Sequence, residues 1–481
     1  MRNLIRLILI LSPLLLSACA NFSAGNLFSH YSEQNQALYQ AVKQGEYQQA
    51  EAALPDSIAG EILDNMEKGR VYFLNADYDQ SQPYLQQSDQ AVTAQQEQAR
   101  ISISDSAASL GALAANDNMN IYRPADYELG FLHLYLGLNY VLRNQLDDAL
   151  VEMRRANQVQ EKAHQDREEE LESAASKIQD QGLSPNLGSL LSNYPDAGKM
   201  LQAVQNGYLF YLSALLYETA HNLNDAWIDY QRALAVAPDN REVIAGALRV
   251  GTQLGMSQEV ARLEQRYGQD TELSKDRQLS KERKLPKGQA RLLFIEEQGV
   301  VQAMQGWNLS LPIRDKRGNL NLYSVALPHY SPVDKAVQLA RTLPPYQLNG
   351  SPVRTSLLNN VNNMAEQALS ERIPSMILRQ ALRVWAKDRL RKEAEKQSEG
   401  IGGLIFNVWN ALTEQPDTRS WLTLPSTVFS AHAYVPAGTQ TLNVDGKTYS
   451  FQADAGQTVL VWMSRQGGHA TIWHKSLGRW E

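Results

Sequence analysis

A repeated helical spacing within residues 207–240 constrains this chain more than any other feature of its sequence. Two short segments each carry apolar residues at positions i, i+4 and i+7, which places each set on one face of a helix. These residues are Phe210, Ala214 and Tyr217 in the first segment, and Ala226, Tyr230 and Ala233 in the second. Pro238 then ends the second helix, because proline has no backbone N–H to donate.

This pattern is typical of the tetratricopeptide repeat (TPR), a helix–turn–helix unit of about 34 residues. One unit cannot bury its apolar face alone, so it implies neighbours. We expect further units beginning near Tyr31, Ile62 and Gly130. The unit at Gly130 carries the signature most clearly, at Leu136, Gly137, Tyr140, Ala149, Met153 and Ala156. A last helix pair is expected over residues 241–254 and 258–267.

Two irregularities interrupt the repeats. The starts at Ile62 and Gly130 lie two repeat lengths apart, so we expect a degenerate unit between them, with one helix over residues 95–115. Residues 164–205 form an insertion whose charged beginning continues the preceding helix, and whose remainder is rich in Pro and Gly. The insertion is either a solvated excursion or an extension of the binding surface. The repeat domain as a whole spans residues 31–267.

The beginning of the chain has the pattern of a secretory signal, with Arg2 and Arg6 before a short apolar run. Residues 16–19, Leu-Ser-Ala-Cys, are similar to the lipobox of bacterial lipoproteins, so we expect residues 1–18 to be removed and Cys19 to be acylated. Cys19 is the only cysteine, which excludes an internal disulfide. The alternative is an ordinary signal peptide with a chance cysteine. Residues 19–30 would be the lipid anchor and tether, and Ala20 implies sorting to the outer membrane, facing the periplasm.

The last third of the chain changes to strand patterns. Residues 268–290 form a basic linker, either a solvated connection or a contact for anionic lipid. From residue 291 to 481, short alternating runs are separated by turn pairs such as Asn349-Gly350 and Asp445-Gly446. A helical insertion over residues 356–415 interrupts them, with one helix over 357–369 and a second starting at Pro374.

The predicted fold is therefore α+β, an N-terminal all-α TPR solenoid followed by a C-terminal β-sandwich-like domain with a helical insertion. Residues 401–412 form an apolar run too short to span a bilayer. They are either buried or interfacial. Residues 379–412 as a whole are thus an alternative site of membrane contact.

Motifs for catalysis, cofactors or metals are missing from the sequence. There is no HExxH, no G-x-S-x-G and no phosphate-binding glycine loop, and the eight histidines are scattered. The formal net charge is −7, with no basic domain of the kind that binds nucleic acid. We therefore predict no catalytic residues, no cofactor, no metal and no nucleic-acid partner.

A polar cluster joins the helical insertion to the final strands, at Asp417, Arg419 and Trp421, followed by Leu424-Pro425. Asp417 and Arg419 can pair, and a tryptophan can stack on a guanidinium. The cluster is either a recognition loop or a structural corner that ties helices to sheet.

This DTRSW…LP element, with the lipobox at Cys19, resembles a proteobacterial family of TPR-containing lipoproteins of unknown biochemical function. Residues 127–136, residues 149–155 and the turn at 434–438 share the resemblance. It implies an envelope location and this architecture, and it supplies no catalytic residues.

The predicted function follows from anchor and repeats together. We expect an outer-membrane lipoprotein that acts as a protein–protein adaptor in cell-envelope assembly or maintenance. An envelope protein or peptide would bind the concave TPR face, and Cys19 would contact the membrane. The alternative is an envelope enzyme that acts on peptidoglycan or glycan and uses the repeats for targeting.

Overall fold

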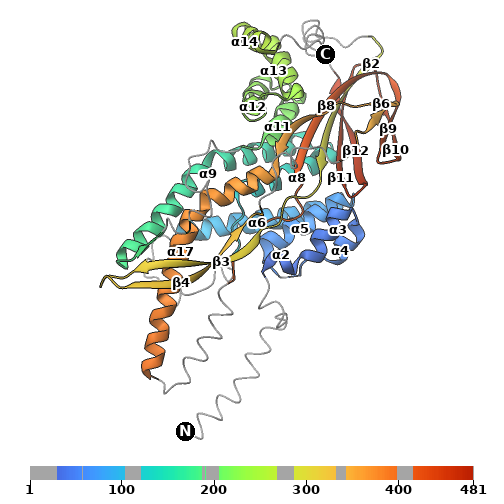
Figure 1. The fold of residues 1–481 in the computed structure, drawn as a ribbon. Coiled ribbons are helices and arrows are strands. Elements are labelled where there is room, and N and C mark those ends of the chain that lie inside the picture. The colour runs from blue at the N-terminus through green and yellow to red at the C-terminus, as the bar shows by residue number, and fades with distance from the viewer. Residues whose placement is uncertain are drawn as a thin grey trace.

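The computed structural model describes residues 30–56, 58–102, 121–186, 190, 205–267, 287–331, 343–397 and 415–479. The signal sequence, Cys19, most of the predicted linker and the apolar run 401–412 lie outside these ranges. The fold is mixed α+β, with a helical N-terminal region and a C-terminal region rich in β-sheet (Figure 1).

The N-terminal helices form an array in which each described helix packs on the next one along the chain. They are α2 (Tyr31–Gln34), α3 (Gln36–Gln44), α4 (Tyr47–Ala52), α5 (Glu61–Leu74), α6 (Tyr78–Ser102), α8 (Asp126–Leu142), α9 (Leu146–Asp180), α11 (Gly207–Thr219), α12 (Leu223–Val236), α13 (Arg241–Leu254) and α14 (Ser257–Tyr267). Gly69 and Gly137 let neighbouring helices approach closely, since a Cβ there would lie 2.5 Å from Leu85 and Met153 respectively.

The strands within the described ranges form three sheets. They are β1 (Ser184–Pro185), β2 (Gln289–Gln298), β3 (Gln305–Arg314), β4 (Leu320–His329), β5 (Gln347–Leu348), β6 (Ser351–Pro352), β7 (Ser356–Asn360), β8 (Thr427–Pro436), β9 (Gly438–Val444), β10 (Lys447–Ala453), β11 (Gln457–Gln466) and β12 (His469–Arg479). The largest sheet has the order β12-β11-β2-β8-β7, and only its β11–β2 pair is parallel.

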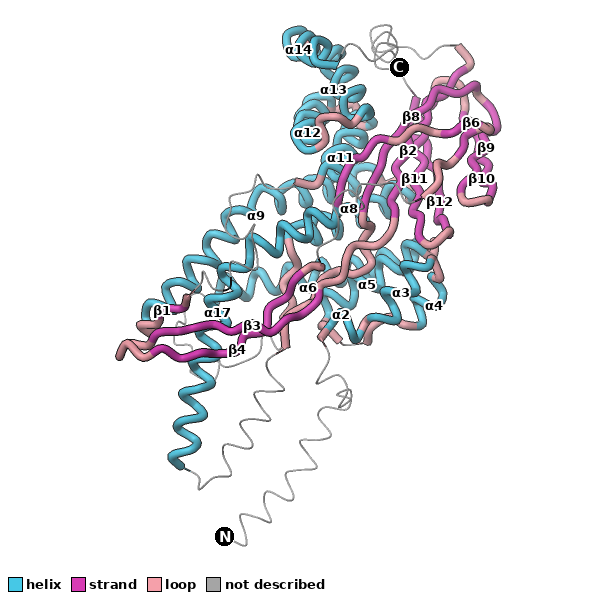
Figure 2. Tube along the Cα trace, viewed as in Figure 1, coloured by secondary structure: helices cyan, strands magenta, loops and turns pink. Residues whose placement is uncertain are grey.

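Both faces of this five-stranded sheet are covered. One face packs on the four-stranded sheet β10-β9-β5-β6 through an apolar cluster that includes Phe294, Val461 and Leu442. The other face shares a single core with the helices, in which Leu293 and Trp462 join residues of α5, α8 and α11. The helical and β-rich regions are therefore layers around a common core. Figure 2 shows the strands of the large sheet lying beside the helices.

A long hairpin, β3–β4, projects away from these layers beside α9 and the long helix α17 (Val361–Gln397) (Figure 1). β1 adds a short third strand at the outer edge of β3. The buried side chains beneath the hairpin come from the hairpin itself, from α9 and from α17, and include Leu311, Val325, Ile178 and Ile377.

Several local predictions are wrong. Residues 95–102 continue α6 without a break, because the Gln- and Ala-rich segment contains nothing to end the helix, and the remainder of the helix predicted over 95–115 lies outside the described residues. Residues 356–360 form strand β7 rather than helix. Pro374 lies inside α17 rather than at the start of a helix. Proline removes one backbone hydrogen bond of the helix, and the packing of buried Ile373 and Ile377 keeps the helix continuous there. Strand β3 was not predicted.

Candidate functional site

Aromatic side chains fill the contact between the helices and the sheet. The indole of Trp462 on β11 donates a hydrogen bond of 3.0 Å to the Tyr208 hydroxyl on α11 and lies edge-on to Phe73 on α5. Tyr135 on α8 packs on Trp421. The chain's own five-stranded sheet packs on one side of α5, α8 and α11 and buries that surface. A protein or peptide therefore cannot reach this buried surface, while the concave TPR face stays a predicted binding site.

The TPR signature residues contribute to packing between helices. Ala149, Met153, Ala156, Ala214, Ala226, Tyr230 and Ala233 have no exposed surface, Leu136, Phe210 and Tyr217 are nearly buried, and Tyr140 and Pro238 are partly buried. Tyr230 packs against Gly246, where a Cβ would lie 2.1 Å from its ring. The small residues mark where helices cross, and none of this set forms an accessible site.

The segment at 417–425 connects the layers from inside. Asp417 and Arg419 pair at 2.7 Å, and Trp421 is fully buried. The backbone N–H of Trp421 donates to Glu128 on α8 at 2.7 Å, and that of Leu422 donates to Glu67 on α5 at 2.7 Å. A tryptophan in this position cannot stack on an external partner, so the segment has the position of a structural corner.

Glu67 and Glu128 are buried carboxyl groups that receive several hydrogen bonds. Glu67 also accepts from the Thr423 hydroxyl at 2.6 Å, and Glu128 accepts from the backbone N–H of Ala125 at 2.7 Å. Burial raises the pKa of Glu67 to about 8, although the hydrogen bonds from Thr423 and Leu422 oppose the shift. Burial also raises the pKa of Glu128.

Two buried ion pairs flank β2. Glu297 faces the helices and pairs with Arg70 at 2.6 Å, while Glu296 faces the other sheet and pairs with Arg465 at 2.7 Å. Asp445 adds a second carboxylate to Arg465. Sequence reasoning missed all of these groups. The available signal was the adjacent pair Glu296-Glu297 inside an otherwise apolar strand.

These charged clusters are enclosed. They therefore stabilise the contacts between the layers of the fold. In the described ranges, no group of three or more His, Cys, Asp or Glu side chains is placed to hold a metal ion. Among the same residues, no helix combines the length and apolarity needed to cross a bilayer.

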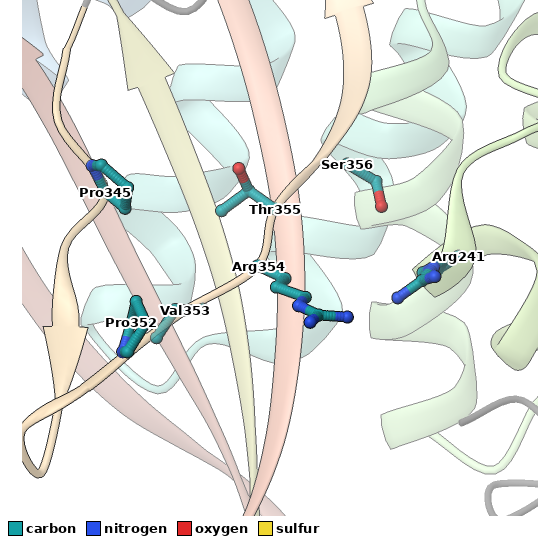
Figure 3. Close-up of a pocket in the computed structure, with 7 residues that line it drawn as sticks. All are labelled: Arg241, Pro345, Pro352, Val353, Arg354, Thr355 and Ser356. Carbon is teal, nitrogen blue, oxygen red and sulfur yellow. The ribbon is translucent and has the colours of Figure 1, made fainter. Parts of the chain in front are cut away.

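An accessible pocket of about 430 Å³ lies where α13 meets the segment between β6 and β7. Its lining residues are Arg241, Pro345, Pro352, Val353, Arg354, Thr355 and Ser356. Figure 3 shows the side chains of Arg241 and Arg354 pointing toward each other from the two walls. Arg354 is exposed and Arg241 is partly buried.

Asn240 fixes the two walls of this pocket relative to each other. Its side-chain oxygen caps α13 by accepting from the backbone N–H groups of Glu242 and Val243, at 3.1 and 3.0 Å. Its amide group donates to the Leu357 carbonyl at 3.0 Å and to the Ser430 hydroxyl at 2.8 Å. A buried polar contact beside the pocket therefore joins α13 to strands β7 and β8.

Comparisons with known proteins leave the class of the protein open. No family model matches the chain, and no curated protein matches it. Among solved structures, MamA from AMB-1 is 13% identical over 50% of this chain and 94% of its own, with a TM-score of 0.26.

Two further solved structures give similar values. PilW, described as a widely conserved type IV pilus biogenesis factor, is 12% identical over 53% of this chain and 98% of its own, with a TM-score of 0.24. Aspartyl phosphate phosphatase F from Bacillus subtilis is 13% identical over 56% and 60%, with a TM-score of 0.28. At TM-scores this low, the likeness carries no argument about fold, partner or function.

Proposed function

We propose that this protein is a TPR-containing adaptor of the cell envelope, anchored to the outer membrane by acylated Cys19 and facing the periplasm. In this proposal it binds a partner protein, and the pocket between Arg241 and Arg354 receives an acidic segment of that partner. The helix pairs are TPR units that build the scaffold, and the protein is a binding protein rather than an enzyme.

The observation that carries the proposal is the pair of arginines facing each other across an accessible pocket (Figure 3). A guanidinium group presents a rigid fork of donors that matches a carboxylate, and two such groups favour an acidic ligand. Pro345 and Pro352 stiffen the opposite wall, because proline fixes its own backbone angle. The charged clusters named above are enclosed, whereas Arg354 in this pocket is exposed.

The direct test is co-purification from detergent-solubilised envelopes with the full mature protein as bait. We expect a reproducible partner with the unmodified protein, and at least about a tenfold loss of it with the double variant Arg241→Glu/Arg354→Glu. Arg123→Glu is the matched control, since Arg123 is an exposed arginine outside the pocket.

Two results would count against the proposal. One is the absence of any reproducible partner. The other is equal capture by the unmodified protein and the double variant, which would place binding elsewhere. Circular dichroism checks that both variants retain the fold.

A further inference from the structure

The β3–β4 hairpin carries an exposed apolar patch near its turn. Leu322 and Leu320 are 70% and 64% exposed, the highest values among the large apolar side chains that the structure describes. Pro312 lies directly opposite Leu322 in the strand register and shares its face. The hairpin itself projects from the rest of the fold (Figure 1). Single exposed leucines need no explanation, but two on one face of such a hairpin form a patch.

The fold fixes this exposure. Side chains alternate along a strand, and the opposite face of the hairpin is committed to the core with α9 and α17, through Leu311, Ile313 and Val325. Moving Leu320 and Leu322 into that core would require a one-residue slip of the register and would expose the residues now buried. The patch is therefore held outward by a rigid support.

Cationic side chains surround the patch. Arg314 lies opposite Leu320 in the register, and Lys316 and Arg317 are exposed in the turn. The one acidic residue of the turn, Asp315, accepts hydrogen bonds of 2.9 Å from the backbone N–H groups of Arg317 and Asn319. Asp315 thus holds the turn together, and the turn keeps an excess of positive charge.

The neighbouring part of α17 is also basic. The Tyr323 hydroxyl of β4 lies 3.3 Å from Asp388 on α17. Asp388 pairs with Arg391 at 2.8 Å and with Lys392 at 2.6 Å, and Arg389 nearby is exposed. These α17 charges lie on the side of the hairpin opposite Leu320 and Leu322, because Tyr323 belongs to the face that packs on α17.

We propose that the end of this hairpin inserts into the head-group region of an anionic phospholipid bilayer. Leu320, Leu322 and Pro312 enter the boundary with the acyl chains, while Arg314 and Arg317 bind lipid phosphates. Apolar side chains next to cations are the combination that holds peripheral proteins on anionic membranes.

The segment between Cys19 and the described chain is long enough for the hairpin and the proposed lipid anchor to reach the same membrane. This point rests on the proposed acylation of Cys19. The described chain begins at the base of the hairpin, where the Ser32 hydroxyl donates to the Met304 carbonyl at 2.7 Å. Strand β3 runs about 33 Å from there to the turn. The residues from Ala20 to His30 reach at most about 40 Å when extended.

The test is flotation with the mature chain carrying Cys19→Ser, which removes acylation as a source of binding. We expect flotation with vesicles of phosphatidylethanolamine and phosphatidylglycerol, and none with phosphatidylcholine alone. Leu320→Ser/Leu322→Ser should weaken partitioning at least about tenfold. Arg314→Glu/Arg317→Glu should weaken it at least about fivefold per residue and remove its salt dependence.

Ile228→Ser is the matched control, because Ile228 is an exposed apolar residue on α12, and it should float like the parent chain. Failure of the parent chain to float, or equal flotation of the hairpin variants, would overturn the proposal. So would a dimer in light scattering that the leucine variant converts to monomer without any lipid binding, since the occupant would then be a second copy. Co-purification reads the Arg241–Arg354 pocket separately, so failure of one proposal leaves the other standing.

Discussion

The adjacent residues Glu296 and Glu297 place two buried ion pairs on opposite faces of β2, and the pairs differ in what they connect. Glu297 meets Arg70, which comes from α5, with both side chains fully enclosed. Glu296 meets Arg465 from the neighbouring strand β11, with Asp445 from the β9–β10 turn beside it. The first pair fastens helices to sheet. The second joins neighbouring strands of one sheet, and Asp445 links its arginine to the other sheet.

The surroundings of the two arginines differ as well. Arg465 is surrounded by acceptors, since it also donates to the Pro344 carbonyl at 3.0 Å. Arg70 lies 4.4 Å from the centre of the Tyr135 ring, and its Nη1 has no hydrogen-bond partner among the described residues. A charge with a single carboxylate partner depends on that partner more strongly. We therefore expect the helix-side pair to be the more sensitive of the two.

The largest expected effect is that of Arg70→Ala, which leaves Glu297 buried without its cation. Breaking a buried pair from one side costs about 3–5 kcal/mol, because an uncompensated charge remains. We expect a loss of this size in the free energy of unfolding, measured by urea denaturation.

The double variant Arg70→Met/Glu297→Leu is the control for this prediction. It removes both charges and keeps the volume, so most of the lost stability should return. A loss below about 1 kcal/mol for Arg70→Ala would show that this pair does not fasten the layers.

A second prediction concerns Glu67, which fastens the same helix to the segment at 422–423 without any cation. Burial raises the pKa of Glu67 in the folded state to about 8, above its ordinary value of 4.5. The folded state then binds more protons than the unfolded state between these values, so stability is full below pH 4.5 and falls as pH rises through 8.

Glu67→Gln removes this titration. Between pH 5 and 8, the free energy of unfolding of the parent chain should fall by roughly 3 kcal/mol relative to the variant, since each pKa unit corresponds to about 1.4 kcal/mol. Urea denaturation at several pH values measures the difference. A difference that stays constant with pH would contradict the raised pKa of Glu67.

Local sequence signals identified local structure well. The helix predicted over residues 241–254 is α13, and the turns at Asn349-Gly350 and Asp445-Gly446 form as expected. Asn349 and Asp445 adopt φ values of 49° and 51°, a conformation that Asn and Asp tolerate and most residues avoid. In these cases the residue itself determines the backbone.

The shared core and the accessible pocket had no comparable signal. Arg70 and Glu297 meet across a separation of 227 residues, and nothing in either local pattern indicates the other. The pocket depends on Asn240, whose sequence role as a helix cap gives no sign of its contacts with Leu357 and Ser430. Strand β7 was missed for the same reason, since it forms by pairing with β8.

The smallest expected effect is that of Asp445→Asn, on the sheet side of the comparison. Arg465 keeps Glu296 and the Pro344 carbonyl in the variant, and asparagine keeps an oxygen that can accept from the guanidinium. Asparagine is also favoured at the positive φ of this turn, so the backbone is not disturbed.

We therefore expect Asp445→Asn to lower the free energy of unfolding by only about 1 kcal/mol. Asp454→Asn is the matched control, because Asp454 is an exposed aspartate near the start of β11, and its effect should be close to zero. A loss from Asp445→Asn as large as that from Arg70→Ala would contradict the comparison. It would mean that the contact between the two sheets depends on single charges as much as the contact between helices and sheet does.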